Sequence, residues 1–179
     1  ISDTCTPQGV LCVLKQFHYN IEEMLRDKAP LFLLLENIQD PGNLGTMLRT
    51  GEGAGVSGII MSRDTVDLYN PKVIRSTMGS IYRVPFYYAD DFAAAVHQVQ
   101  QAGVSVYAAH LRGKNSYACQ DYTKGTAFLI GNEGNGLREE TAELADCYIR
   151  IPMEGKVESL NAAVASSILM YEAHRQRAI

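Results

Sequence analysis

A long connection between a strand and a helix, at residues 151–165, reads Ile-Pro-Met-Glu-Gly-Lys-Val-Glu-Ser-Leu-Asn-Ala-Ala-Val-Ala. A proline ends the strand, one glycine lies in the loop, and Ser159-Leu160-Asn161 begins the helix. Connections of this kind usually need two to six residues, so a loop of about nine residues is long enough to curve around a ligand. The segment therefore predicts an α/β fold with a ligand held by its loops.

The rest of the chain alternates short apolar runs with helical patterns. The runs predict strands at residues 31–35, 59–61, 84–88, 104–109, 126–130 and 148–151. The helical patterns predict helices at residues 43–54, 71–80, 91–102, 137–144 and 160–175. Continuous apolar strands between helices are typical of a parallel sheet covered on both faces. The predicted fold class is α/β, a parallel sheet flanked by helices.

Composition bounds the class of protein. The chain has 179 residues, 46% of them hydrophobic, and no apolar run long enough to cross a membrane, which suits one globular domain. We expect residues 31–179 to form that domain. Residues 1–30 include a turn-forming Thr-Pro-Gln-Gly at residues 6–9 and read as a linker or the edge of another domain.

Cysteine and histidine usage predicts no metal site. The four cysteines form no Cys-x-x-Cys pair and the four histidines stand singly, so we expect free thiols in a reducing cytoplasm. No secretory-signal pattern, nucleophile elbow or P-loop is recognisable. A net charge of −4 argues against binding nucleic acid by bulk electrostatics. Five basic residues in one third of the chain could still form a local patch or be solvated singly: Arg49, Arg63, Lys72, Arg75 and Arg83.

The glycines around residue 50 need separate interpretation. Residues 53–58 match the dinucleotide pattern Gly-x-Gly-x-x-Gly, but they end a helix instead of opening one, so we interpret them as a helix stop and turn. In the helix before them, Gly45, Arg49 and Gly53 recur at four-residue spacing. Two glycines cost roughly 1 kcal/mol each relative to alanine. We therefore expect a close approach there by a ligand, a phosphate or a partner subunit, with a surface salt bridge of Arg49 as the alternative.

A second glycine-rich segment, residues 129–137, reads Leu-Ile-Gly-Asn-Glu-Gly-Asn-Gly-Leu. Its order of strand, glycine loop and helix exposes backbone N–H groups at the carboxyl edge of a sheet. Glu133 is an unusual residue for a phosphate-binding loop. Its carboxylate suits a hydroxyl, an ammonium or a structural bond to backbone N–H better than it suits an anion. A plain glycine-rich turn is the alternative.

The helix start in the opening loop leaves two roles open. Ser159 could cap the helix that begins at Leu160, a contribution of about 1 kcal/mol. Asn161 could satisfy a loop carbonyl or place its amide in a pocket, and the length of the loop favours the pocket. The helix itself places four larger side chains on one face, among small residues that permit close packing: Leu160, Val164, Ile168 and Tyr171.

Together these segments resemble the three motifs of the SpoU/TrmH family, RNA ribose 2′-O-methyltransferases of the SPOUT superfamily. The first motif reads Asp-Pro-x-Asn-x-Gly-x-x-x-Arg at residues 40–49, and the second reads Gly-Asn-Glu-Gly-x-Gly-Leu at residues 131–137. The third reads Ile-Pro-Met-x-Gly-x-x-x-Ser-Leu-Asn at residues 151–161. The resemblance covers residues 31–179 in order and spacing, and three motifs together are far more specific than any one.

This resemblance implies a C-terminal trefoil knot in the parallel α/β domain, with S-adenosylmethionine bound by the knot loops. The cofactor would be held largely by backbone groups of Gly131, Ile151 and Leu160, with Ile130 and Met153 beside the adenine. The resemblance also implies a homodimer that packs through the helix after the third motif. The small-residue helix is consistent with that interface.

The family's catalytic set carries over to five residues. Arg49 would lie near the methyl donor and the target nucleotide, and Asn43 would help to place that nucleotide. Glu133, Ser159 and Asn161 would organise the pocket. Because a guanidinium is effectively never deprotonated in proteins, we expect Arg49 to clamp phosphate and stabilise the developing alkoxide, while phosphate or water accepts the proton.

The implied substrate is ribosomal RNA of the 23S type, with a guanosine as a fitting target. The Thr-Pro-Gln-Gly at residues 6–9 resembles the junction after a small RNA-binding domain in the rRNA-directed members, so residues 1–30 would be a linker or the remnant of that domain. Three alternatives stay open: a tRNA ribose methyltransferase, an enzyme that methylates a base nitrogen, and an inactive RNA-binding protein of the same fold.

Overall fold

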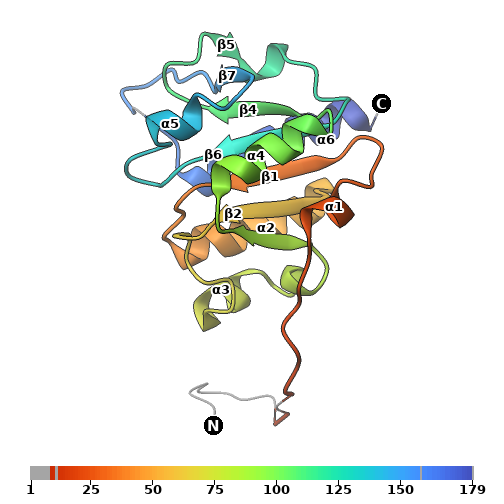
Figure 1. Cartoon of the computed structure of the whole chain (residues 1–179). Helices are drawn as coiled ribbons and strands as arrows, with labels where there is room; N and C mark the ends of the chain where they lie inside the picture. Colours follow the sequence, from red (N-terminus) through yellow and green to blue (C-terminus); the bar gives the residue numbers. More distant parts are fainter. Residues whose placement is uncertain (1–8, 11, 158, 179) are drawn as a thin grey trace.

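The computed structural model describes residues 9–10, 12–157 and 159–178. Within them, parallel strands form a sheet in the order β3-β2-β1-β6-β4-β7-β5, with helices on both faces (Figure 1). The strands are β1 (Leu31–Leu35), β2 (Gly58–Ser62), β3 (Phe86–Ala89), β4 (Ser105–Ala109), β5 (Asn115–Ser116), β6 (Thr126–Ile130) and β7 (Cys147–Arg150). The helices are α1 (Ile21–Met24), α2 (Pro41–Ala54), α3 (Pro71–Ser76), α4 (Phe92–Gln101), α5 (Glu139–Ala142) and α6 (Ala162–Arg177). The predicted parallel α/β sheet is confirmed.

The central strands are apolar on both faces because both faces are covered. Every residue of β1, β2 and β6 is buried, as expected for strands between two helical layers. The parallel register pairs Leu35 with Met61 on one side and with Ile130 on the other. The carboxyl ends of these strands therefore meet at one edge of the sheet.

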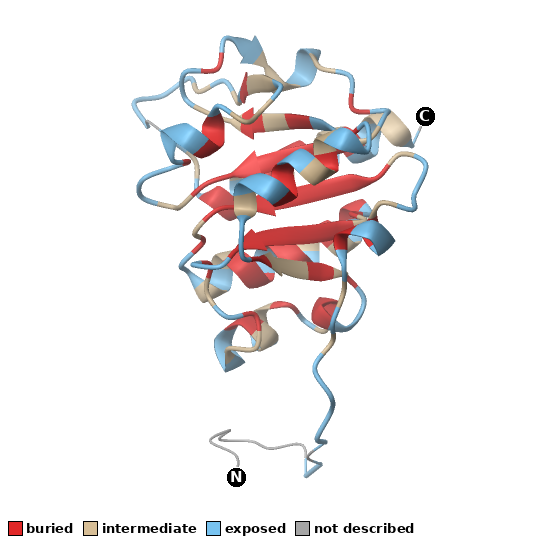
Figure 2. Cartoon of the chain, viewed as in Figure 1, coloured by how far each residue is buried: buried red, intermediate tan, exposed pale blue. Residues whose placement is uncertain are grey.

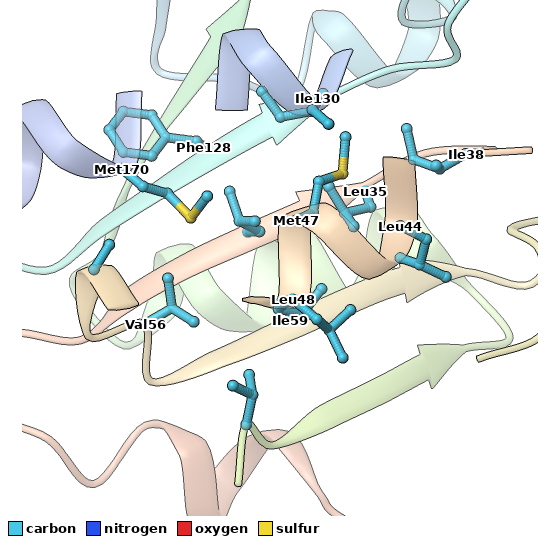
Figure 3. Close-up of a cluster of buried hydrophobic side chains, with 14 of the residues drawn as sticks. Leu35, Ile38, Leu44, Met47, Leu48, Val56, Ile59, Phe128, Ile130 and Met170 are labelled. Atoms are coloured by element: carbon cyan, nitrogen blue, oxygen red, sulfur yellow. The ribbon is translucent and has the colours of Figure 1, made fainter. Parts of the chain in front are cut away.

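Two hydrophobic cores lie on the two faces of the sheet. One packs α2, α3 and α6 against it, and the other packs α1, α4 and α5 against the opposite face (Figure 1). Figure 2 shows buried strands between helices whose outer sides are exposed. Figure 3 shows the first core, where α2 and α6 meet the strands through these side chains: Leu35, Leu44, Met47, Leu48, Ile59, Phe128 and Met170.

Helix α2 starts and stops as its flanking residues dictate. The side chain of Asp40 accepts a hydrogen bond from the N–H of Asn43 at 2.7 Å, and Pro41 occupies the first turn. Gly55 ends the helix in the left-handed conformation, with φ 78°. The interpretation of residues 53–58 as a helix stop is confirmed.

The close approach expected along α2 is made within the chain. A Cβ on Gly45 would lie 1.7 Å from Ser76 Oγ, so α3 can pack here only against glycine. A Cβ on Gly53 would lie 3.0 Å from the hydroxyl of Tyr171 on α6. Gly45 thus lets α3 pack closely on α2, and Gly53 leaves room for the Tyr171 side chain of α6.

Some predicted helices were too long. Helix α3 ends at Ser76 because Met78 and Gly79 adopt left-handed backbone, with φ 51° and 89°, and a 3-10 turn at Ser80–Tyr82 follows. The predicted helix at residues 137–144 shrinks to α5. The predicted helix at residues 160–175 is displaced by two residues at each end, as α6.

Other features were not predicted. Sequence patterns gave no signal for α1, for the two-residue β5, or for the 3-10 turn at Tyr117–Cys119, because such short elements contain too few residues for a period. In α1, Ile21 and Met24 are buried in the second core. The domain boundary at residue 30 stays a prediction, and residues 6–8 of the Thr-Pro-Gln-Gly turn lie outside the described residues.

Two kinds of feature are absent from the described part of the chain. Among residues 9–10, 12–157 and 159–178, no helix is long and apolar enough to cross a membrane. Nor do His, Cys, Asp and Glu gather in a metal-binding group of three or more within that part of the chain.

Candidate active site

A cavity of about 250 Å³ opens at the carboxyl edge of the sheet. It lies where β4, β6 and β7 end, next to the point at which the chain has crossed from the β1-β2-β3 half of the sheet to the other half. Open parallel sheets bind ligands at such points. The turn after β4, the loop after β6 and the long connection after β7 supply its walls.

All the residues assigned to cofactor binding line this one cavity. They come from the end of β6 and from the connection between β7 and α6, and comprise Ile130, Gly131, Ile151, Met153 and Leu160. Ser159 lines the same space. The structure thus brings the second and third motifs together around one ligand-sized volume.

The loop after β6 folds tightly on itself. Asn132 and Gly136 exchange backbone hydrogen bonds of 3.0 and 2.9 Å, and the side-chain oxygen of Asn132 accepts from the N–H groups of Gly134 and Asn135. A Cβ on Gly131 would lie 2.2 Å from the backbone nitrogen of Leu137. Only glycine permits this closure, which presents loop backbone to the cavity.

Glu133 reaches out of this loop to the first motif. Its carboxylate accepts hydrogen bonds from the N–H of Gln39 at 3.1 Å, the N–H of Asp40 at 3.0 Å and Asn43 Nδ2 at 3.0 Å. Burial acts to raise the pKa of Glu133, but these hydrogen bonds outweigh it, so the pKa lies below its ordinary value. Of the three roles left open for this carboxylate, the structure shows the bond to backbone N–H.

Asn43 and Asn161 extend the connection to the third motif. Asn43 Oδ1 accepts from Asn161 Nδ2 at 3.0 Å, and Asn161 Oδ1 accepts from the N–H groups of Ala163 and Val164 at 2.9 and 3.2 Å. The cap that Ser159 could have provided is made by Asn161, which is the residue before α6. Its amide is favoured here because the oxygen can serve the helix while the nitrogen binds Asn43.

A second hollow, of about 670 Å³, adjoins the cavity. Its lining is polar and comprises Gln39, Asp40, Pro41, Asn43, Asn132, Glu133 and Asn161. Asn132 and Glu133 line both spaces. A largely apolar cavity thus stands beside a more open polar hollow, an arrangement that can bring two ligands together.

Arg49 lies apart from the other residues of the predicted catalytic set. It is exposed on α2, about 9 Å along the helix axis from Asn43 at about 1.5 Å per residue. It lines neither the cavity nor the hollow. Between described residues no ion pair involves it, so the surface salt bridge that was its alternative role is not seen.

Sequence reasoning missed a buried carboxylate beneath the site. Glu36 is 1% exposed and accepts from the N–H of Arg138 at 2.8 Å and from the hydroxyl of Thr141. It thereby ties the end of the glycine loop to β1. Its position directly after a wholly apolar strand, at the carboxyl edge of the sheet, could have marked Glu36 as a site residue.

A strained turn next to Glu36 was missed as well. Asn37 has φ 53°, and its carbonyl accepts from Asn132 Nδ2 at 2.8 Å. Strained backbone of this kind often marks a functional site. Here it links the segment just before the first motif to the second motif.

Comparison with known proteins identifies the family. Residues 30–171 match the model of the SpoU rRNA Methylase family. The chain belongs to this family. The match spans all three motifs, so the resemblance read from them is confirmed.

Two curated relatives and one solved structure are informative. The 23S rRNA (guanosine(2553)-2′-O)-methyltransferase RlmP of Bacillus subtilis (strain 168) is 35% identical over 96% of this chain and 66% of its own. The 23S rRNA (guanosine-2′-O-)-methyltransferase RlmB of Ralstonia nicotianae is 33% identical over 100% of this chain and 74% of its own. The SpoU methyltransferase AviRb from Streptomyces viridochromogenes, solved in complex with the cofactor AdoMet, superposes with a TM-score of 0.82.

The structural match to AviRb is 31% identical and covers 89% of this chain and 62% of AviRb. Among the curated relatives, the chain spans 66% of the length of one and 64% of the length of another.

Proposed function

We propose that this chain carries the catalytic domain of an S-adenosylmethionine-dependent methyltransferase that modifies a ribose 2′-hydroxyl of RNA. One observation carries the proposal: the residues assigned to the cofactor line a single cavity, beside a hollow lined by Asn43, Glu133 and Asn161. The names of the two rRNA-directed relatives and the AdoMet complex of AviRb support it.

The lining of the cavity fits S-adenosylmethionine. Ile130, Met153 and Leu160 provide apolar walls for a flat base, and the backbone of residues 131–137 provides donors and acceptors for its polar edges. When bound, the cofactor supplies an electrophilic methyl group on a sulfonium. No acidic ligand for its ribose is required, because Glu133 is already engaged by the first motif.

Three side chains act as positioning residues. Glu133, Asn43 and Asn161 link the cavity loop, the start of α2 and the start of α6 by consecutive hydrogen bonds. This network fixes the cavity relative to the polar hollow, where the target ribose would lie. Alignment of the two reactants is worth several kcal/mol in such transfers.

Arg49 is assigned to the RNA. It is exposed on the helix whose first turn lines the hollow, so a phosphate next to the target nucleotide would lie within its reach. Its planar guanidinium suits a phosphate better than a lysine would. We keep stabilisation of the developing alkoxide as its second role, with phosphate or water as the proton acceptor. Lys72 and Arg75 on the adjoining α3 would extend the phosphate-binding surface.

The proposed assembly is a homodimer formed through α6. Val164 and Tyr171 are 48% and 50% exposed on one face of this helix, an unusual exposure for apolar side chains that recur at helical spacing. Gly53, one turn after Arg49, lies against Tyr171, so Arg49 would border the interface. If V164E leaves the chain dimeric in analytical ultracentrifugation, the interface is elsewhere.

The proposed knot is supported by the segment between β4 and β6. At one end it supplies β5, so that β7 lies between β4 and β5. At its other end it contacts the last turn of α6: Gln176 Nε2 donates to the carbonyl of Gln120 at 3.0 Å, and Arg177 Nε donates to that of Tyr122 at 2.8 Å. A chain that passes through this loop between β7 and α6 would make both sets of contacts. An experimental backbone trace in which residues 151–177 pass outside the loop would refute the knot.

Ribosomal RNA of the 23S type, modified at a guanosine, is the proposed substrate, following the two relatives named for that activity. An enzyme for that substrate would work in the cytoplasm. A transfer RNA target is the alternative.

Methyl transfer in vitro tests the proposal. The protein would be incubated with isotope-labelled S-adenosylmethionine and with unmodified ribosomal or transfer RNA, and the RNA would be digested to nucleosides. We expect label in a 2′-O-methylnucleoside and a large loss of turnover in R49K. Label on a base nitrogen would overturn the reaction type. A folded protein that binds RNA but not S-adenosylmethionine in calorimetry would indicate the inactive RNA-binding protein.

A further inference from the structure

One wall of the cavity comes from outside the three motifs. The turn that follows β4 contributes Ala109, His110 and Leu111. Leu111 is 62% exposed although it lines the cavity, so an apolar part of the occupant would cover it. His110 is the only imidazole among the lining residues, and no role has been assigned to it.

The His110 ring is held from several sides. Its Nδ1 accepts a hydrogen bond from the backbone N–H of Arg112 at 3.1 Å, and the backbone N–H of His110 donates to the carbonyl of Ile149 at 3.0 Å. The ring lies 5.1 Å from that of Tyr148, tilted by 30°. The turn is pinned further at Gly113, where a Cβ would lie 2.8 Å from the carbonyl carbon of Ile149.

These contacts select one protonation state. Because Nδ1 accepts from a backbone N–H, the ring is neutral and its proton is on Nε2. A protonated ring would place a second donor against the Arg112 N–H. Nε2 is thus the nitrogen left to meet a ligand in the cavity.

The charges around the ring favour the same state. Burial lowers the pKa of His110, Arg112 lowers it further, and Glu139 of α5, which is paired with Arg112, acts in the opposite direction. The net pKa is below the ordinary value. The charged residues that line the cavity are Arg150 of β7 and Glu133 of the loop after β6.

We propose that His110 is a cofactor-binding residue, which donates a hydrogen bond from Nε2 to an acceptor on the nucleoside part of S-adenosylmethionine. The inference rests on the proposed function. A neutral donor suits this cofactor because its sulfonium is cationic, and a protonated ring would add like charge to the cavity. A protonated His110 ring would repel the product, S-adenosylhomocysteine, less, because the sulfur of the product is uncharged.

A pair of amide variants separates the cofactor contact from a purely structural role. In H110N the side-chain oxygen can replace Nδ1 toward Arg112, while the donor at the Nε2 position is lost. In H110Q the amide nitrogen can replace Nε2, while the Arg112 contact is lost. Calorimetry with S-adenosylmethionine should show about fivefold to tenfold weaker binding for H110N and a smaller loss for H110Q. H97N, at an exposed site on α4, is the matched control and should bind like the wild type.

The pH dependence provides a second readout. As the pH falls through the pKa of His110, wild-type affinity for S-adenosylmethionine should decrease, and by more than affinity for S-adenosylhomocysteine. H110Q should lack this component. Imidazole ¹⁵N spectra should show His110 as the Nε2–H tautomer, assigned by the signal that disappears in H110Q.

The failures of the two proposals are distinguishable. If the wild type binds the cofactor and H110N binds equally well, or if H110Q is the weaker variant, the inference is overturned while the proposed function stands. An Nδ1–H tautomer would overturn it as well. If the folded wild type does not bind S-adenosylmethionine, the proposed function itself fails.

Discussion

Asn161 makes two contacts with opposite ends of one amide. Its oxygen caps α6 and its nitrogen binds Asn43, so the start of one helix is tied to the start of another, 118 residues away in sequence. The motif identified Asn161 as a site residue, but sequence could not choose Asn161 over Ser159 as the cap. Both are good caps, and only the position of Asn43 in space decides between them.

Asn161 variants should separate these two contacts. N161D keeps an oxygen for the helix N–H groups and loses the donor to Asn43, so its stability should stay near that of the wild type while methyl transfer falls by tenfold or more. N161A loses both, and its free energy of unfolding should fall by about 1 kcal/mol. Urea denaturation and the methyl-transfer assay measure the two effects. Full activity in N161D would show that the Asn43 contact is dispensable.

Glu133 should make stability depend on pH. Its folded pKa lies below the unfolded value, so its contribution is fully present above the unfolded pKa of about 4.3 and is lost as pH falls through the folded pKa. In E133Q the free energy of unfolding should be lower by about 1–3 kcal/mol at pH 7. The difference from wild type should shrink in acid. A difference that stays constant from pH 7 down to acid unfolding would contradict the assigned role.

At the scale of elements, the glycine loop can be tested by two glycines three residues apart. A Cβ at residue 131 would meet backbone at 2.2 Å, whereas one at Gly134 would find its nearest neighbour, Asn132 Oδ1, at 3.6 Å. G131A should therefore lose cofactor affinity by tenfold or more, and G134A should keep it. Calorimetry with S-adenosylmethionine compares them. Equal affinity in the two variants would show that the loop does not shape the cavity.

The strands and the helices differed in how well they could be predicted. The short apolar runs located β1 and β6 with their observed bounds, because strands buried on both faces are apolar almost throughout. Helix ends were less predictable. The left-handed Met78 that ends α3 early has no local signal, since methionine does not favour that conformation.

At the scale of the molecule, function depends on how the sheet orders its strands. Asn43 and Glu133 are 90 residues apart in sequence, yet Asn43 Nδ2 lies 3.0 Å from Glu133 Oε1 because β1 and β6 are neighbours. Strand order cannot be read from periodicity, so the pattern alone gave the α/β class and the family motifs gave the site. The position of Arg49 outside the cavity, and the contribution of His110 to it, required the structure.

The central claim is that this domain methylates a ribose 2′-hydroxyl of ribosomal RNA, and the intact gene provides its most direct test. Ribosomal RNA from cells with and without the gene would be digested and mapped by mass spectrometry for 2′-O-methylnucleosides. One such nucleotide, expected to be a guanosine of the large-subunit RNA, should be missing without the gene and restored by the wild-type copy but not by one carrying R49A. If every 2′-O-methylated position persists in both RNA classes, or if a base methylation is lost instead, the claim is contradicted.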